Sequence, residues 1–336
     1  MWQIVGHDSV VTQLRNSIAE DRVSHAYLFT GAPHIGKRTL SLNLAQALNC
    51  KEEERPCGHC TSCHKIEEGI HPDVRIIDLH HQALLRGETL AQQNELRIDT
   101  VRAVEADISL RPFEGQRKVF IIPEAEIMNP QAANCLLKTL EEPPPHAVLL
   151  LTASDARLLL PTIVSRCQVF GLRLLPTDVI AKELERRWGV SEAQASLIAR
   201  LSEGRMGWAI TAAQDAMTLT QREERLQQLL ALPNVGRIDR LDYAAQLSHH
   251  PHLIGEVLEL WLSWWRDLLL VRSGCEEMIT NVDLFAPLEK QASKHSPRDL
   301  SGFMKAIRRT MMQLELNANP RLALEVLMLD LPVGTD

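Results

Sequence analysis

The chain of 336 residues lacks the features that would place it in a membrane or outside the cell. No apolar run is long enough to cross a bilayer, and the N-terminus lacks the charged start, apolar middle and small-residue cleavage site of a secretory signal. Internal repeats and low-complexity tracts are also missing. We therefore expect a globular, cytoplasmic protein that does not enter a membrane, and the length favours two or three domains.

A basic excess is missing as well, although proteins that bind nucleic acid over a whole surface usually have one. The formal net charge is -7, with 45% hydrophobic and 24% charged residues. A local basic patch is still compatible with this charge. A helix that starts near Ile98 and carries Arg102 could hold a DNA phosphate, or it could be an ordinary capped helix.

Two magnesium ligands are missing from an otherwise complete phosphate-binding pattern. Gly31 to Lys37 has the spacing of a P-loop, between an apolar run and a helical pattern. A Ser or Thr normally follows the lysine, and an aspartate normally ends the partner strand Val119–Ile122. Here these positions are Arg38 and Pro123. The sequence therefore predicts the fold of a nucleotide-binding protein without its hydrolysis.

Weak, metal-independent nucleotide binding stays open at this loop. Thr39 lies roughly 100° around the helix from the position of the missing hydroxyl, so it should not replace it. The candidate nucleotide contacts, with weak or no binding, are Gly31, Gly36, Lys37 and Thr39.

The first 170 residues alternate between short apolar runs and amphipathic helical patterns. Alternation of this kind predicts an α/β fold with a parallel sheet covered by helices. A helix should begin at Asn129-Pro130 and stop before Pro143. The expected strands are Ala26–Phe29, Val74–Leu79, Val119–Ile122, Val148–Thr152 and one that begins at Val169.

The strand signal disappears after Pro176, and the rest of the chain reads as helical. We predict three domains: residues 1–170, a small helical domain at 171–213, and a helical domain at 214–336. The apolar stripe from Ile254 to Leu269 is widened past a single helix face by Trp264. Such a stripe must be covered on more than one side, either inside the domain or by another subunit.

Four of the 7 cysteines lie close together in the sequence, and this spacing is typical of a metal site. Thiolates at such spacing on a tight loop can converge on Zn²⁺. A redox pair, an iron–sulfur cluster, or a histidine in place of one thiolate are the alternatives. The candidate zinc ligands are Cys50, Cys57, Cys60 and Cys63.

Arg166 lies in the tripeptide Ser165-Arg166-Cys167, after the fourth expected strand. An arginine there could reach the γ-phosphate of a neighbouring subunit's nucleotide, as an arginine finger does. By itself the tripeptide also fits a solvated surface turn. The histidines His71, His80 and His81 have no partner set that indicates catalysis.

These motifs, in this order, resemble the bacterial clamp loader subunits of DNA polymerase III, which are AAA+ proteins. The resemblance covers essentially the whole chain. It implies a P-loop domain with an inserted zinc module, a helical lid and a helical collar that joins the subunits, and it gives Arg166 the role of a trans-acting arginine. The segments that carry it are Ile4–His7, His25–Phe29, Ala133–Pro144, Ser165–Cys167 and Asn319–Glu325.

The departures from the family pattern indicate the type of subunit. The motor subunits, gamma and tau, also carry a nucleotide-sensing arginine at the position of Gly207. With three parts of the ATPase site lost and Arg166 kept, the chain resembles the delta-prime type. That type is a stator that partners gamma/tau and delta subunits, the sliding clamp and, through the complex, primed DNA.

The resemblance therefore implies a component of the DNA polymerase III holoenzyme without catalysis of its own. Two alternatives stay open at this point. One is an active gamma/tau-like ATPase that uses Glu124 and Thr39 in unorthodox ways. The other is a zinc-dependent DNA-binding adaptor.

Overall fold

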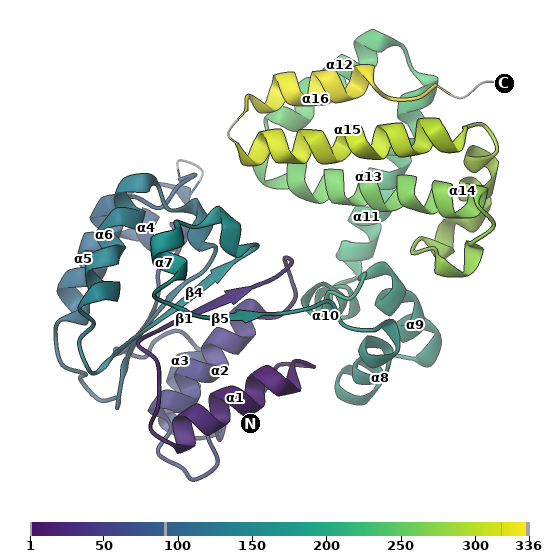
Figure 1. Cartoon of the computed structure of the whole chain (residues 1–336). Helices are drawn as coiled ribbons and strands as arrows, with labels where there is room; N and C mark the ends of the chain where they lie inside the picture. The colour runs from purple at the N-terminus through teal and green to yellow at the C-terminus, as the bar shows by residue number, and fades with distance from the viewer. Residues whose placement is uncertain (1, 91–92, 317, 334–336) are drawn as a thin grey trace. The chain divides into compact units, whose positions relative to one another are not determined.

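The computed structural model describes residues 2–90, 93–316 and 318–333. By their internal contacts the residues form two compact units (Figure 1). Unit 1 is Met1–Val179 with Gly204–Trp208, and unit 2 is Ile180–Glu203 with Ala209–Asp336. The predicted three-domain division stays a prediction. Among the described residues, no helix is both long and apolar enough to span a bilayer.

Unit 1 is built on a five-stranded parallel sheet of order β2-β3-β4-β1-β5. This confirms the predicted α/β fold class. β2 is shorter than expected because Asp78 accepts a hydrogen bond from the His81 N–H and caps the next helix. The strands are β1 (Ala26–Thr30), β2 (Val74–Ile76), β3 (Lys118–Ile122), β4 (Ala147–Ala153) and β5 (Gln168–Gly171).

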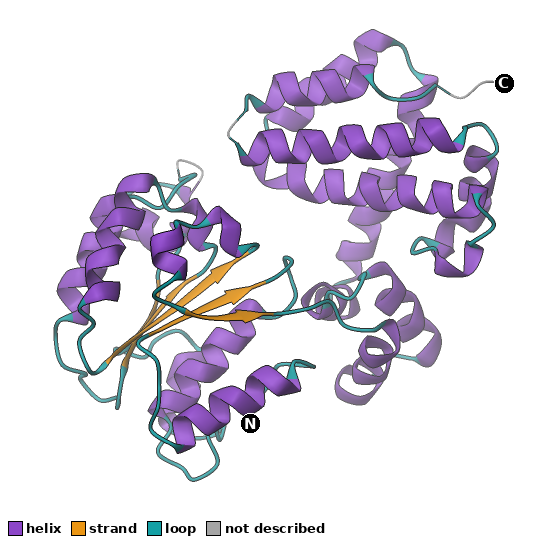
Figure 2. Cartoon of the chain, in the orientation of Figure 1, coloured by secondary structure: helices purple, strands orange, loops and turns teal. Residues whose placement is uncertain are grey.

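The two faces of the sheet are buried under different helices, as Figures 1 and 2 show. Alternate residues of a strand point to opposite faces. Tyr27 and Phe29 pack with Leu14 and Leu44 of two N-terminal helices. Ala26 and Leu28 belong to a separate cluster, which includes side chains of the helices that flank β3 and β4. The helices are α1 (Asp8–Ala19), α2 (Lys37–Asn49), α3 (Thr61–Glu67), α4 (Leu79–Arg86), α5 (Ile98–Ile108), α6 (Pro130–Glu141) and α7 (Pro161–Val164), with single 3₁₀ turns at Ala125–Ile127 and Ala156–Leu158.

Helix α6 begins and ends where the sequence predicts. The Asn129 side chain accepts a hydrogen bond from the Ala132 N–H, and Pro130 occupies the first turn. The helix ends at Glu141, two residues before Pro143. This helix matters for the site because its end lies beside Arg166.

Beyond Gly171, every regular element among the described residues is helical, as predicted. Helix α8 begins at Thr177, directly after Pro176, and α16 begins after Asn319, whose side chain accepts a hydrogen bond from the Leu322 N–H. The helices are α8 (Thr177–Trp188), α9 (Glu192–Leu201), α10 (Met206–Gln214), α11 (Ala216–Ala231), α12 (Arg237–Ser248), α13 (Pro251–Arg272), α14 (Phe285–Ala292), α15 (Pro297–Glu315) and α16 (Pro320–Leu329), with 3₁₀ turns at Leu232–Asn234, Glu276–Met278 and Val282–Leu284.

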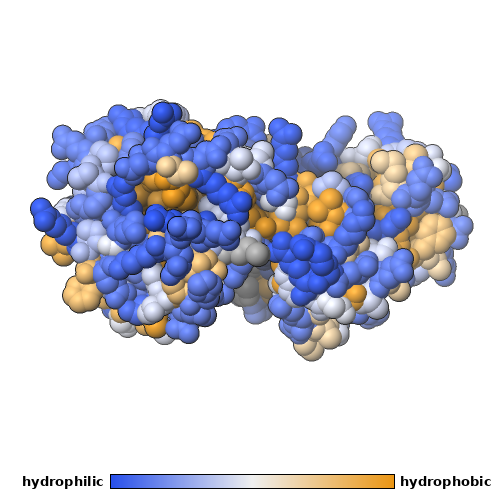
Figure 3. Space-filling model, turned by 90° about the horizontal axis from the view of Figure 1, so that it is seen from below, coloured by the Kyte–Doolittle hydropathy of each residue, from blue (hydrophilic) through white to orange (hydrophobic). Residues whose placement is uncertain are grey.

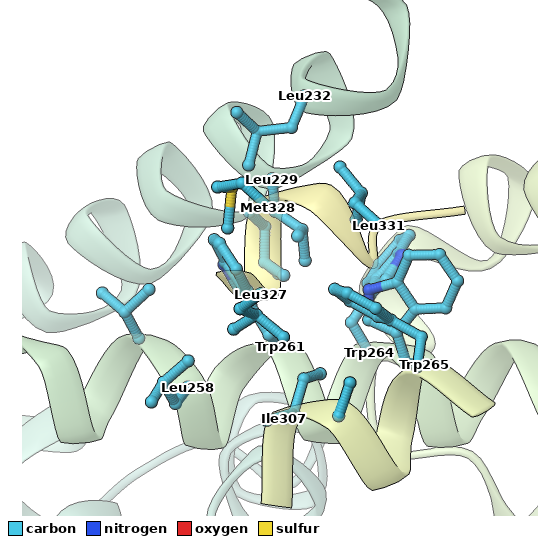
Figure 4. Close-up of a cluster of buried hydrophobic side chains, with 14 of the residues drawn as sticks. Leu229, Leu232, Leu258, Trp261, Trp264, Trp265, Ile307, Leu327, Met328 and Leu331 are labelled. Carbon is cyan, nitrogen blue, oxygen red and sulfur yellow. The ribbon is translucent and has the colours of Figure 1, made fainter. Parts of the chain in front are cut away.

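The tryptophans of α13 lie inside unit 2. Trp261, Trp264 and Trp265 are each 0% exposed, and they pack against side chains from α15 and α16 (Figure 4). The Trp264 indole N–H donates a hydrogen bond of 2.9 Å to the Gln291 side chain. The wide apolar stripe is therefore covered within the chain. Of the two covers that the sequence left open for these tryptophans, the structure shows the one inside the domain, and packing of the tryptophans against another subunit is wrong.

The face of the molecule in Figure 3 is mostly hydrophilic, with apolar residues in separate patches. Scattered exposed apolar residues are normal for a globular protein. A regular apolar stripe on one helix is a different feature, because helices bury such stripes. Helix α16 carries one, with Leu322, Val326 and Leu329 at 60%, 50% and 62% exposure.

Candidate functional site

The P-loop connects the carboxyl end of β1 to α2, which is the edge where parallel sheets bind ligands. Gly31 and Gly36 have φ of +144° and +111°, values that L side chains rarely adopt. A Cβ on Gly31 would also lie 2.8 Å from the Leu172 carbonyl oxygen. The predicted glycines are therefore required by the backbone path. Together with the start of α2 they form a loop of the phosphate-binding type.

Lys37 turns its ammonium group back onto this loop. Its Nζ donates hydrogen bonds to the carbonyl oxygens of Gly31 (2.5 Å) and Ala32 (3.0 Å). Burial lowers the pKa of Lys37 below its ordinary value, and the carboxylates of Glu126 and Glu124 partly offset this shift. The ammonium is thus held by the loop's own oxygens in the place where it would otherwise meet a phosphate.

The positions that would hold magnesium carry other groups. Arg38 is exposed, and Pro123 directly follows the fully buried β3. Thr39 lies on the first turn of α2, one residue further than the hydroxyl of an ordinary P-loop. Glu124 adopts a left-handed φ of 51°, and its N–H donates to the Thr152 hydroxyl at 3.1 Å.

Three polar residues beside this edge were not singled out from the sequence. Glu126 accepts hydrogen bonds from the N–H and the hydroxyl of Ser154, at 2.8 and 2.6 Å. Thr152, near the end of the apolar β4, is buried and accepts from Glu124. A usable signal existed, since Thr152 interrupts an apolar strand that pairs with β1 and Ser154 directly follows that strand.

Gly207 contacts the P-loop directly. Its N–H donates a hydrogen bond of 2.7 Å to the His34 carbonyl oxygen. A Cβ built on Gly207 would lie 2.6 Å from that same oxygen, which is closer than real Cβ atoms come. The backbone of this segment therefore occupies space at the loop, and any side chain at position 207 would displace it.

Arg166 follows the short helix α7 and lies away from the P-loop residues in the sequence. Its Nη1 donates to the Thr162 carbonyl oxygen (3.0 Å) and its Nη2 to Glu141 Oε1 (2.7 Å). The arginine side chain is 34% exposed. Cys167 packs against the adjacent core, and burial raises its pKa to about 12. The guanidinium is thus accessible, and its base is fixed by packing.

The four predicted zinc ligands come together. Their Sγ atoms all lie within 4.8 Å of one another, with Cys50–Cys60 at 4.0 Å and Cys57–Cys63 at 3.9 Å. A tetrahedral zinc with bonds of about 2.3 Å separates its sulfurs by about 3.8 Å. This donor set therefore fits a single four-coordinate ion.

The chain positions these thiols with local backbone geometry. Cys50 caps the end of α2, and Cys60 caps the start of α3, where its sulfur accepts the Cys63 N–H. Burial opposes ionisation of Cys57, but hydrogen bonds from the His59 and Cys60 N–H groups and from neighbouring thiols bring its pKa to about 6. Burial raises the pKa of Cys63 and of Cys50.

One alternative for the cysteines, a histidine in place of one thiolate, finds no support among the described residues. All seven cysteines are free thiols, and the metal-binding group contains no histidine. Of the isolated thiols, Cys135 lies 3.2 Å from Glu105, and the Cys275 thiol lies 3.8 Å from the Ser273 carbonyl.

The remaining candidates are Arg102 and the histidines. Arg102 is exposed on α5, which has no side-chain cap at its start. His71 is buried between the Ser62 hydroxyl, 3.2 Å from its Nε2, and the Asp73 N–H, which donates to its Nδ1. His81 donates its backbone N–H to the cap of α4. None of these contacts forms a catalytic set.

Comparison with known proteins identifies the class of protein. Residues 6–176 match the family described as DNA polymerase III, delta subunit, and residues 216–332 match that described as DNA polymerase III, delta subunit, C terminal. The chain therefore belongs to the DNA polymerase III delta subunit family.

One similarity over nearly the whole chain is to a delta-prime protein. DNA polymerase III subunit delta' of Bacillus subtilis is 28% identical over 336 residues, which covers 97% of this chain and 96% of that protein. DNA polymerase III subunit tau of Escherichia coli is 33% identical over 226 residues, but this chain spans only 32% of tau. The predicted type, a delta-prime-type clamp loader subunit, is confirmed.

Among solved structures, a DNA polymerase III gamma subunit-related protein from Thermotoga maritima aligns with 94% of this chain and 97% of its own. Its sequence identity is 20% and the TM-score is 0.49. The branch migration motor RuvB of Thermotoga maritima aligns with 67% of this chain at 17% identity and a TM-score of 0.42.

Proposed function

We propose that this chain is the stator of a DNA polymerase III clamp loader, a delta-prime-like cytoplasmic subunit that helps to load the sliding clamp onto primed DNA. The family and the nearly full-length similarity to a delta-prime protein support this role. In it the chain contributes Arg166 to the ATP of a neighbouring motor subunit and hydrolyses none itself.

The observation that carries the proposal is an accessible arginine on a chain whose P-loop lacks the usual magnesium ligands. The Arg166 guanidinium is held at the surface by one carboxylate and one carbonyl group. A guanidinium that contacts the γ-phosphate in the transition state raises the rate of hydrolysis by a factor of about 10³–10⁵ where this has been measured. Arg38 and Pro123 occupy the two positions at which the motif normally supplies its magnesium ligands.

The contacts of the P-loop also support a degenerate nucleotide site. The Lys37 ammonium is bound by the Gly31 and Ala32 carbonyls, so a phosphate would have to displace these bonds. At Gly207 there is no room for the arginine that senses nucleotide in the motor subunits. Nucleotide binding by Gly31, Gly36, Lys37 and Thr39 is therefore expected to be weak or absent.

In our proposal Zn²⁺ is the ion held by Cys50, Cys57, Cys60 and Cys63. A zinc ion there would tie the end of α2 to the start of α3 and fix the loop between them. Residues 51–54 of that loop are exposed, so this stretch adds no buried side chain to the fold. The role of the ion is then structural, because all four of its ligand positions are filled by the protein.

The proposed partners are gamma/tau and delta subunits, and we place their contacts on the helical part of the chain. The exposed face of α16 is apolar, while its other face, with Leu324 and Leu327, is buried in unit 2. A helix with two apolar faces needs a second cover. The collar predicted at residues 214–336 contains this helix.

The test is ATP hydrolysis by the complex reconstituted with motor and delta subunits. Arg166→Ala should slow turnover on the order of 10³-fold at the nucleotide that the arginine contacts, with the mass of the complex unchanged. Turnover equal to that of the wild type would reject the finger role.

The isolated chain separates this proposal from the two other functions. Magnesium-dependent ATP hydrolysis that Lys37→Ala abolishes would indicate an active motor. DNA binding by the isolated protein with a steep salt dependence would indicate an adaptor. The stator should show neither.

A further inference from the structure

Arg166 is positioned by a residue from a distant part of the chain. Glu141, the last residue of α6, accepts a hydrogen bond of 2.7 Å from Arg166 Nη2. The Thr162 carbonyl oxygen accepts a second one from Nη1 at 3.0 Å. A guanidinium has five N–H donors. Within the described part of the chain two of them are used, and three are left for an external anion.

Helix stability does not explain a carboxylate at this position. The C-terminal end of a helix carries partial negative charge, and acidic side chains are unfavourable there. Glu141 nevertheless ends α6, and the next residue, Glu142, is also acidic. The contact with Arg166, 25 residues away in the sequence, gives Glu141 a partner that its own helix does not supply.

The two elements that carry this pair are rigidly joined. Leu136 and Leu140 of α6 and Ile163 of α7 are almost completely buried in the same core cluster. The distance between the end of α6 and the base of Arg166 is therefore fixed by packing. Since both side chains are partly exposed, at 51% and 34%, the ion pair adds little to the stability of the fold. It does restrict the rotamers of a long side chain.

We propose that Glu141 is a positioning residue for Arg166. It holds the guanidinium with its free donors outward, so that less conformational freedom is lost when these donors meet anionic oxygens of the neighbouring subunit's nucleotide. This inference rests on the proposed function of Arg166. The carboxylate lies on one side of the guanidinium and contacts no transferred group, so it acts only through the arginine.

The experiment is steady-state ATP hydrolysis by the reconstituted complex with five versions of this chain: wild type, Arg166→Ala, Glu141→Ala, Glu141→Gln and Glu142→Ala. Glu141→Ala should lower kcat about fivefold and leave KM within about twofold, because positioning acts in the transition state. Glu141→Gln keeps an oxygen acceptor and should restore most of the loss. Glu142→Ala removes the same charge one residue away, at an exposed side chain, and should equal the wild type.

A double variant completes the design. Glu141→Ala combined with Arg166→Ala should be no slower than Arg166→Ala alone, because Glu141 acts only through the arginine. Unchanged or faster turnover with Glu141→Ala, or an equal loss with Glu142→Ala, would overturn the inference while the role of Arg166 stands. Normal turnover with Arg166→Ala would overturn both. The mass and melting temperature of each complex verify that assembly is intact.

Discussion

Lys37 and Arg166 are the two cationic side chains on which the proposed role depends, and their surroundings differ. Lys37 is half-buried and bound by two carbonyl groups of its own loop. Arg166 is more accessible and bound by a carboxylate that lies at the surface. The guanidinium has five N–H donors, so those not bound to Glu141 and Thr162 can meet an anion while the pair with Glu141 is kept. The first side chain is therefore suited to hold a loop closed, and the second to contact another molecule.

Asp267 of α13 offers a test of electrostatics at a single residue. Its side chain is completely buried, and Oδ2 accepts hydrogen bonds from the Thr280 N–H (2.9 Å), the Asn281 N–H (2.7 Å) and the Asn281 side chain (2.7 Å). Oδ1 has no hydrogen-bond partner among the described residues. Arg266 Nη1 is 4.0 Å from Oδ1 and also contacts Glu203 at 3.6 Å. Burial is the largest influence and raises the pKa of Asp267, against these hydrogen bonds and Arg266.

This raised pKa predicts a loss of stability as the pH rises. Between the ordinary carboxyl pKa of about 4 and the raised value, the folded state keeps a proton that the unfolded state has released. The free energy of unfolding should then fall by up to about 1.4 kcal/mol per pH unit in this window. Asp267→Asn removes the group that titrates. The free energy of unfolding of the wild type minus that of the variant should therefore decrease as the pH increases. Tryptophan fluorescence in denaturant series at several pH values measures it.

The control is Asp242→Asn, at an exposed residue of α12. The difference in free energy of unfolding between this variant and the wild type should be the same at every pH tested. If the Asp267→Asn difference is equally flat, the buried carboxyl does not titrate as described.

At the scale of elements, the sequence predicted most starts and ends correctly, since these depend on local chemistry. Asn129 and Asn319 cap α6 and α16 because their side chains reach the third N–H of their own helix. The error at β2 has the same cause. The expected strand Val74–Leu79 includes Asp78, whereas in the structure the Asp78 side chain caps α4 and the strand ends at Ile76.

The segment from Cys50 to Cys63, which carries the four clustered cysteines, gives the prediction at the scale of elements. Protein purified without added metal should contain about one zinc per chain. Removal of the metal by a chelator under reducing conditions should open the loop from Lys51 to Cys60, because residues 51–54 are exposed and add no buried side chain that would hold it. Hydrogen exchange should become faster in this loop and stay unchanged in unit 2.

Matched variants separate zinc binding from a general thiol effect. Cys57→Ser should lose the metal, while Cys275→Ser, which changes a thiol outside the cluster, should keep it. Iron in place of zinc, or no metal at all, would contradict the prediction.

At the scale of the whole molecule, the exposed face of α16 predicts how the chain assembles. The variant Leu329→Glu would place a charge in the proposed subunit contact. Because burial of a leucine contributes about 1.5–3 kcal/mol, we expect the affinity for motor subunits to fall at least about tenfold. Sedimentation of mixtures with a motor subunit measures this. Met217→Glu, at a residue of α11 with 55% exposure, is the control and should assemble normally. Equal assembly of both variants would place the contact elsewhere.

By itself, the sequence determined the order of strands and helices, the missing magnesium ligands and the group of four cysteines. These features depend on residues that lie close together in the chain or on single positions of a motif. The tertiary structure decided the contacts between distant segments: Gly207 with His34, Glu141 with Arg166, and the tryptophans of α13 with their own core. Periodicity shows that a helix face must be covered, but only the path of the whole chain determines what covers it.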